Sequence, residues 1–426
     1  MPKLARDPSL IPPISELLAA PEIRRGFHFL KQNNGFSDDD LAGICEIAAP
    51  PFKETRRAEY VAQRLRELDF GEVTTDDVGN VLARRTGTGA ARTGLGKDGH
   101  RSNGGGKGRT VVISAHLDTV FPEETDVRVR RQGTRLYAPG ISDNACGIAS
   151  LLSLASIIAA SGINTAGSIL LAATVGEEGE GNLRGVRHLF AGGALKGEAC
   201  DFVSLDGPGL ERITSRALGS RRFRVTITGP GGHSWGDFGT VNPVHALGRA
   251  IARFAAYPAP LSPRTSFNVG IVEGGNSVNA IPEKASMTVD ARSTSADEID
   301  RIESYLRRVV DIAVTEENAQ RALSGTDLDS TIDLIGDRPS GETPPDSPIV
   351  QTAVECSRIL GIETRLDCSS TDSNIPISLG IPAITIGVGG LSGNCHSLTE
   401  WYEPTGRELG LKRLLLLTVA LAGLGD

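Results

Sequence analysis

The stretch Thr110–Asp118, TVVISAHLD, decides the fold class of this 426-residue chain. It begins as a short run of β-branched, apolar residues and ends in a histidine and an aspartate. Similar short runs recur at 168–174, 202–205 and 383–388, and helical stretches lie between them, the clearest at 144–160. Continuous apolar strands that alternate with helices predict an α/β fold with a mainly parallel mixed sheet and helices on both faces.

Residues 216–341 show a different pattern. Two segments alternate between apolar and polar side chains, at 221–228 and 286–292, which is typical of a sheet with one wet face. Ser295 and Glu298 have the spacing of a capping box at the start of a helix expected at 296–314. The buried face of that helix is predicted to carry Ile299, Ile302, Leu306 and Val310. We therefore expect a catalytic domain of residues 1–215 and 342–426, with a smaller α+β domain inserted at 216–341.

Composition excludes several classes of protein. The formal net charge of −8 argues against nucleic-acid binding. The six cysteines are scattered without a CxxC pair, which predicts reduced thiols. The N-terminus lacks the apolar run of a signal peptide, and the longest apolar helical stretch, 147–160, is shorter than the roughly 18 residues of a membrane span. We expect a cytoplasmic protein.

Residues 87–108 are rich in glycine and polar side chains. Glycines can indicate phosphate binding, but this segment lacks a GK[ST] ending and precedes a strand rather than a helix. The segment therefore predicts a long surface loop.

Acidic residues and histidines collect where the predicted strands end and, in the case of Asp143, where the long helix is expected to begin. Ligand sites of open α/β sheets form beyond the carboxyl ends of the strands, so we expect these side chains on one rim. Each has an ordinary alternative alone: a helix N-cap, a turn residue or a surface histidine. Their combination is harder to explain in that way. The residues are His116, Asp118, Asp143, Glu177, Glu178, Asp206 and His396.

This set of imidazoles and carboxylates suits catalytic zinc, cobalt or manganese better than structural zinc. It is too large for one ion and fits two divalent cations about 3.5–4 Å apart, bridged by a carboxylate. One further carboxylate is needed to take a proton from water and pass it to the leaving amine. The residues alone therefore predict a di-metal hydrolase.

The motifs resemble the M20 family of metallopeptidases, which includes carboxypeptidases, di- and tripeptidases and N-acyl-amino-acid deacylases. The resemblance spans positions 114 to 404, and the LRGVRH segment is most similar to the tripeptidase-like members. The matching segments are SAHLDTV, APGISDNACG, TVGEEGEGNLRGVRH, SLDGPG, GPGGHSW, NAIPEKASMTVDAR and GNCHSLTEWYEP.

The resemblance implies a role for each residue of the cluster. His116, Asp143 and Asp206 would hold one metal, and Asp143, Glu178 and His396 the other, with Asp143 bridging. Glu177 would be the general base. Asp118 would hydrogen-bond His116 and fix its tautomer. The family often has a second aspartate after the bridging one, where this chain has Asn144.

The inserted domain would be the family's lid, which commonly also forms a dimer contact. His233 would donate a hydrogen bond to the oxyanion, in many members from the partner subunit, and Asn279 and Arg292 would contact substrate. The ordinary alternatives are a histidine in a glycine-rich turn and a solvated arginine. We expect a homodimer formed through the lid.

The leading hypothesis is a tripeptidase-like exopeptidase for short peptides with two divalent ions, zinc before cobalt or manganese. The alternatives are an N-acyl-amino-acid deacylase, a carbamoyl-chain amidohydrolase and a catalytically inactive binding protein. The intact ligand set and Glu177 argue against the last of these. Cys146 and Cys395 lie close in sequence to presumed ligands and suit packing better than regulation, and Ser370–Asp372 is a candidate substrate-facing segment.

Overall fold

The computed structural model describes residues 14–32, 38–89, 109–323 and 325–425. The chain divides into two compact units: unit 1 comprises Met1–Ala217 with Glu342–Asp426, and unit 2 comprises Leu218–Gly341. Beyond Gly89, the surface loop expected at 87–108 lies outside the described residues.

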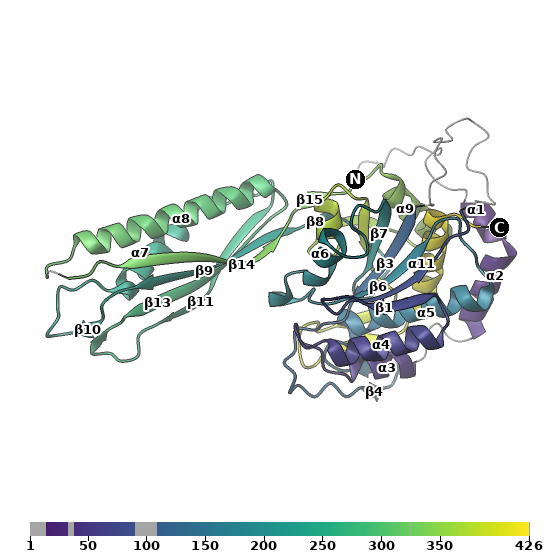
Figure 1. The fold of residues 1–426 in the computed structure, drawn as a ribbon, viewed down its shortest axis with the longest axis horizontal. Coiled ribbons are helices and arrows are strands. Elements are labelled where there is room, and N and C mark those ends of the chain that lie inside the picture. Colours follow the sequence, from purple (N-terminus) through teal and green to yellow (C-terminus); the bar gives the residue numbers. More distant parts are fainter. Residues whose placement is uncertain (1–13, 33–37, 90–108, 324, 426) are drawn as a thin grey trace. The chain divides into compact units, whose positions relative to one another are not determined.

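Unit 1 is built on a mixed sheet with the strand order β1-β2-β6-β3-β7-β17-β8-β15, and β16 pairs with β8 (Figure 1). The central strands β6, β3, β7 and β17 are mutually parallel, whereas β1 pairs antiparallel with β2, β2 with β6, and β8 with β17. The predicted mainly parallel mixed sheet is therefore confirmed. Its strands are β1 Glu72–Thr75, β2 Val81–Arg85, β3 Thr110–His116, β6 Ile169–Thr174, β7 Cys200–Leu205, β8 Arg212–Ala217, β15 Gly341–Glu342, β16 Arg365–Ser369 and β17 Ala383–Ile386.

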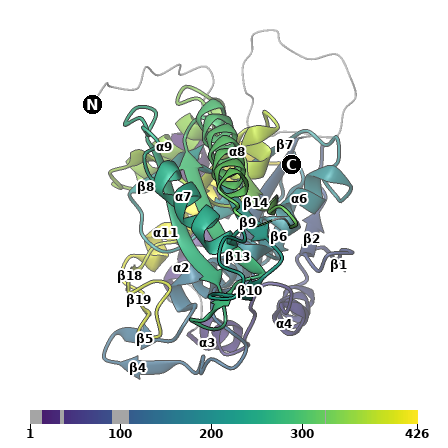
Figure 2. The same ribbon diagram turned by 90° about the vertical axis from the view of Figure 1, so that its left-hand side faces the viewer.

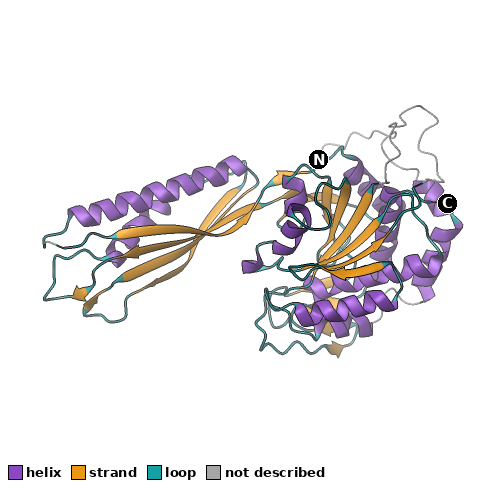
Figure 3. Cartoon of the chain, viewed as in Figure 1, coloured by secondary structure: helices purple, strands orange, loops and turns teal. Residues whose placement is uncertain are grey.

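Helices cover both faces of this sheet (Figure 3). Along β3, Val111 and Ile113 point into the larger apolar core and Val112 into the smaller one, as the alternation of a strand requires. The larger core includes α1 Ile14–Ala19, α2 Pro21–Gln32, α3 Asp38–Cys45, α4 Thr55–Glu67, α5 Cys146–Ser161, α9 Pro348–Ile359 and α11 Arg407–Ala422. The smaller core includes α6 Arg184–Ala191 and α10 Asn374–Ser378.

The apolar helical stretch around α5 is longer than the sequence pattern indicated. Ile141–Ser161 has a mean hydropathy of 1.6 over its most apolar window, long and apolar enough to cross a membrane. That window is 83% buried inside the structure, as in the core helix of a globular unit. The predicted limit at 147–160 was therefore too short, because the apolar stretch continues through Ile141–Ala145, which joins α5 across a kink with non-helical backbone at Asp143 and Asn144.

A second, small sheet lies near the carboxyl ends of the central strands. Trp401 pairs with Tyr137, so the chain following His396 runs beside the chain that leads to Asp143. This pairing brings two distant sequence segments to one place. The strands, in order, are β18 Leu391–Gly393, β19 Trp401–Glu403, β5 Arg135–Tyr137 and β4 Arg130–Gln132.

Unit 2 is an antiparallel sheet in the order β11-β13-β9-β14, with α7 and α8 packed on one face (Figure 2). The alternation predicted for β9 and β13 is confirmed, since Phe223, Val225, Met287 and Val289 are buried. A short pair, β10 with β12, lies outside this sheet. The bounds are β9 Gly219–Thr228, β10 Gly232–His233, α7 Pro243–Phe254, β11 Thr265–Gly274, β12 Ala280–Ile281, β13 Lys284–Ser293, α8 Ala296–Ala319 and β14 Asp329–Arg338.

The predicted capping box at the start of α8 is wrong. Ser295 occupies the N-cap position but makes no side-chain cap hydrogen bond. Instead, its amide donates to the hydroxyl of Ser293, and the carboxylate of Glu298 pairs with Arg301. The predicted face is confirmed, since Ile299, Ile302, Leu306 and Val310 are all buried.

Candidate metal centre

Three overlapping groups of metal-binding side chains lie at the carboxyl ends of the central strands. Within each group, the potential ligand atoms lie within 4.8 Å of one another. The groups are His116, Asp143 and Asp206; Asp143, Cys395 and His396; and His116, Glu177 and Glu178.

Asp143 is common to two of these groups, and its two carboxylate oxygens face different histidines. Oδ1 lies 3.0 Å from Nε2 of His116, and Oδ2 lies 3.1 Å from Nε2 of His396. The same nitrogen of His396 is 3.2 Å from Oε1 of Glu178. This arrangement places one carboxylate between two histidines, which is the geometry that a bridging ligand would need.

Asp143 does not begin the long helix, as the sequence suggested. Its backbone is not helical (φ −134°, ψ 89°), and α5 starts three residues later at Cys146. The neighbouring Asn144 is fully buried, donates to the carbonyl of Leu205 at 2.8 Å and accepts from the amide of Gly207 at 3.4 Å. This asparagine therefore ties the Asp143 segment to the end of β7, where Asp206 lies.

Asp118 hydrogen-bonds His116, as expected, through its main chain rather than its carboxylate. Its main-chain carbonyl, at 3.0 Å, is the hydrogen-bond partner of Nδ1 of His116, whereas its carboxylate is 3.7 Å away. The two carboxylate oxygens accept instead from the amides of Glu177, at 2.9 Å, and Glu178, at 2.7 Å. The carbonyl thus fixes the His116 tautomer, and the carboxylate holds the turn that carries both glutamates.

The positive charge within the cluster stabilises the ionised form of Asp143 but not that of Asp206. Burial, followed by the negative charge of Asp143, raises the pKa of Asp206 to about 7. Burial acts to raise the pKa of Asp143, but hydrogen bonds from His116 and His396 outweigh it and lower that pKa. For His116, burial opposes the charged form, but the bond and charge of Asp143 raise its pKa well above the usual value.

The sequence profile described as peptidase family M20/M25/M40 matches residues 112–418. The chain belongs to this family. It is an enzyme of the metallopeptidase and amidohydrolase class, which hydrolyses amide bonds.

The relatives of this M20 enzyme have more than one activity. A putative succinyl-diaminopimelate desuccinylase from Mycobacterium tuberculosis is 25% identical over 361 residues, covering 82% of this chain and 88% of its own. A tripeptidase from Staphylococcus aureus has the same fold, with a TM-score of 0.71 at 18% identity over 91% of this chain and 99% of its own. A dinuclear metal-binding M20 peptidase from Bacillus subtilis gives a TM-score of 0.61 at 17% identity, over 90% and 97%.

The three expected lid residues of this M20 enzyme lie in unit 2, in two separate places. His233 on β10 pairs with Ala280, and the carbonyl of Asn279 accepts from the amide of Ser234 at 3.0 Å, so these residues are neighbours. Arg292 lies near the end of β13, where its Nε donates to Asp290 at 2.7 Å. The strand rises by about 3.3 Å per residue, so roughly 25 Å separates Arg292 from the start of β13, next to β12.

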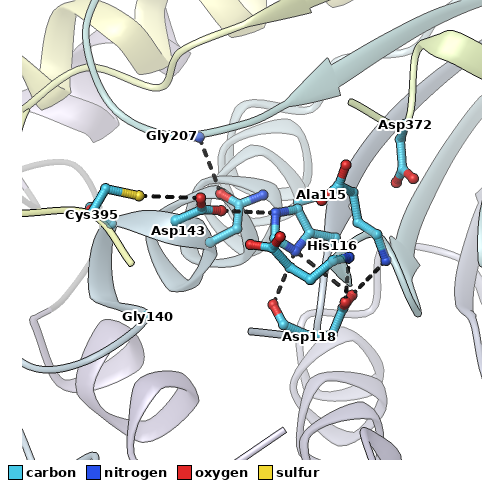
Figure 4. Close-up of polar contacts among 12 residues, drawn as sticks. Ala115, His116, Asp118, Gly140, Asp143, Gly207, Asp372 and Cys395 are labelled. Carbon is cyan, nitrogen blue, oxygen red and sulfur yellow. Dashed lines mark hydrogen bonds and ion pairs between the residues drawn. The ribbon is translucent and has the colours of Figure 1, made fainter. Parts of the chain in front are cut away.

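All six cysteines are free thiols, as expected. Cys146 is buried, and its thiol donates to the carbonyl of Ser142 at 3.1 Å. Cys395 is exposed and lies 3.4 Å from Oδ2 of Asp143 (Figure 4).

Two further buried side chains form hydrogen bonds at the ends of β3 and β6, next to the cluster. The guanidinium of Arg57 is buried and donates to the carbonyl of Leu117 at 2.7 Å, between His116 and Asp118. Asp372, in the segment considered as substrate-facing, is buried and accepts from the hydroxyl of Thr174 at 2.5 Å. Arg57, on α4, was missed because nothing in the sequence indicates that an arginine on a helix is buried.

Proposed function

We propose that this M20 hydrolase is a di-metal exopeptidase that acts on short peptides, like a tripeptidase. The observation that carries the proposal is the position of Asp143 between the two histidines, with Glu177 and Glu178 on the adjoining turn. The LRGVRH segment and the fold shared with the Staphylococcus aureus tripeptidase favour peptides as substrates.

The side chains present fit two divalent cations. Their donors are imidazole nitrogens and carboxylate oxygens, which suit zinc, cobalt or manganese in a catalytic site, and we propose zinc. His116, Asp143 and Asp206 would hold one ion, and Asp143, Glu178 and His396 the other. The raised pKa of Asp206 supports this assignment, because a nearby cation would offset the cost of its ionised form.

Bound cations would supply Lewis acidity to the scissile carbonyl and to the attacking water. Glu177 would take a proton from that water and deliver it to the leaving amine nitrogen. The carboxylate of Asp118 holds the main chain of Glu177, which fixes where that proton transfer takes place. His116 is held by the carbonyl of Asp118, so its Nε2 is the nitrogen available to a metal.

We propose that His233 donates a hydrogen bond to the developing oxyanion. Its Nδ1 accepts from the amides of Trp235, at 3.1 Å, and Gly236, at 3.2 Å. A ring nitrogen that accepts hydrogen bonds carries no proton, so the neutral ring carries its proton on Nε2. The loop therefore presents a fixed donor, which is the property that stabilisation of an oxyanion requires.

The separation of His233 and Asn279 from Arg292 within unit 2 supports a homodimer. We propose that Arg292 binds a substrate carboxylate, and that His233 and Asn279 complete the site of a partner subunit. The protein is proposed to act in the cytoplasm.

A deacylase of N-acyl amino acids is the second candidate, favoured by the match to the putative desuccinylase over 82% of this chain. The same metals and base serve both reactions, because each cleaves an amide bond.

Metal-reconstituted enzyme assayed in parallel with tripeptides, dipeptides, N-acetyl and N-succinyl amino acids would separate these candidates. We expect release of a terminal residue from tripeptides, detected by mass spectrometry, at a kcat/KM at least tenfold above that for any N-acyl amino acid. Faster hydrolysis of the N-succinyl substrates would replace the peptidase proposal with the deacylase.

A further inference from the structure

Glu400 is a fully buried carboxylate that lies four residues after His396. Its Oε1 accepts from the amide of Ser142 at 2.8 Å, from the Ser142 hydroxyl at 2.7 Å and from the amide of Asp143 at 3.1 Å. Its Oε2 accepts from the amide of Gly140 at 3.1 Å. A single side chain therefore receives four hydrogen bonds from the segment that ends at the bridging aspartate.

The main chain of Glu400 adds two further links. Its carbonyl accepts from the amide of Ala138 at 3.2 Å, and its amide donates to the carbonyl of Ser397 at 3.1 Å. The side chain thus holds the Asp143 segment, while the backbone holds the loop that carries His396. Glu400 is connected to both residues of the 3.1 Å contact between Asp143 and His396.

A buried carboxylate that only stabilised the fold would need hydrogen-bond partners. Those partners would not have to lie in the segment that carries a proposed metal ligand. Here every side-chain bond of Glu400 goes to residues 140–143, whose backbone is not in a regular α-helix at Asp143. Hydrogen bonds to a carboxylate are short and directional, so they define the position of this segment.

We propose that Glu400 is a positioning residue for the metal centre. It sets the place of the Asp143 carboxylate relative to His396 and thereby sets metal affinity, without contacting the metal or the substrate. This inference rests on the proposed di-metal function.

The test compares Glu400→Gln and Ser142→Ala with wild type after removal of metal. Gln keeps the size of the side chain but places an amide group where a second acceptor is needed. Ser142→Ala removes one donor and leaves the carboxylate and the three main-chain donors in place. The control is Glu317→Gln in unit 2, a buried carboxylate that accepts from the amide of Asn242 at 2.9 Å.

Cobalt(II) titration followed by visible absorption reports affinity, stoichiometry and coordination, and thermal melting of the metal-free proteins reports stability. We expect Glu400→Gln to weaken cobalt binding by about 10- to 100-fold and alter the spectrum, as is typical when the partner of a metal ligand is removed. Ser142→Ala should weaken binding by a smaller factor. Glu317→Gln should change only the melting temperature.

If Glu400→Gln folds and binds cobalt with the same affinity and spectrum as wild type, the inference is overturned. If that variant does not fold, Ser142→Ala decides: unchanged cobalt affinity would equally overturn it. Failure of the wild-type protein to bind two cobalt ions would instead contradict the di-metal proposal, so the two failures are distinguishable.

Discussion

At the scale of single residues, two adjacent glutamates have different surroundings. Glu178 lies 3.2 Å from His396 and belongs to the presumed ligand set. Both glutamates lie in the group with His116, on a turn whose amides donate to the Asp118 carboxylate, but the contact with His396 is made by Glu178. Both side chains are buried, so the difference between them is their partners rather than their exposure.

Glu177→Gln tests the general base. The variant should bind metal as wild type does, because Glu177 is not in the proposed ligand set, while kcat falls by about 10²- to 10⁴-fold. Elemental analysis and steady-state kinetics measure the two effects. Glu180→Gln is the matched control, since Glu180 is exposed on the same segment and should retain activity. Full turnover in Glu177→Gln would assign the base to another residue.

Asp206→Asn tests the charge balance of the metal-free cluster. The pKa of Asp206 is about 7 in the folded protein and about 3.9 in an unfolded chain. A raised carboxylate pKa means that wild type loses stability as pH rises from about 4 to about 7, and the neutral asparagine avoids this loss. With a chelator present, the melting temperature of the variant minus that of wild type should therefore be larger at pH 8 than at pH 5.

With saturating metal, wild type should instead have the higher melting temperature, because it retains a ligand that the variant lacks. If the two proteins differ in melting temperature by the same amount at pH 5 and pH 8 with a chelator present, the raised pKa of Asp206 is contradicted.

At the scale of elements, periodicity predicted the strands and helices well, whereas local hydrogen bonds escaped it. The buried face of α8 was predicted from spacing alone, but its capping box was not formed, because Ser293 and Arg301 offered competing partners. The expected position of Asp143 at the start of a helix placed this residue in the cluster, although its backbone is not helical. Sequence spacing indicates which residues meet; it does not indicate which oxygen of Asp118 bonds His116.

Leu306→Ala tests the packing of α8 on the sheet of unit 2. Leu306 is fully buried in the unit 2 core, so the truncation should cost about 2–5 kcal/mol of unfolding free energy. Arg307→Ala is the neighbouring control: its side chain is 49% exposed and pairs with Glu303, a surface ion pair expected to contribute under about 1 kcal/mol. Urea denaturation measures both. A loss under about 1 kcal/mol for Leu306→Ala would contradict the assigned packing.

At the scale of the whole molecule, the proposed site needs residues from two parts of the sequence. The metal cluster belongs entirely to unit 1, and the proposed oxyanion donor belongs to unit 2. His233→Ala should therefore lower kcat while the metal content stays at the wild-type value. Unchanged kinetics would mean that His233 has only a structural role, in which it accepts hydrogen bonds from the amides of Trp235 and Gly236.

Mixing His233→Ala with Glu177→Gln tests whether the donor acts in a partner subunit. In a mixed dimer, one site would combine the intact Glu177 of one chain with the intact His233 of the other. Random exchange at equal amounts would make about a quarter of the sites intact, and activity should rise accordingly.

A mixture of Glu177→Gln with Asp206→Asn is the matched control for this experiment. Both changes lie in the cluster of unit 1, so each site of a mixed dimer keeps one lesion and no activity returns. Sedimentation of the mixtures should show the dimer, and exchange of labelled subunits should show that mixed dimers form. If the labelled subunits exchange completely and the mixture of His233→Ala with Glu177→Gln stays inactive, His233 does not serve the site of a partner subunit. The separation between Arg292 on β13 and His233 on β10 would then need another explanation.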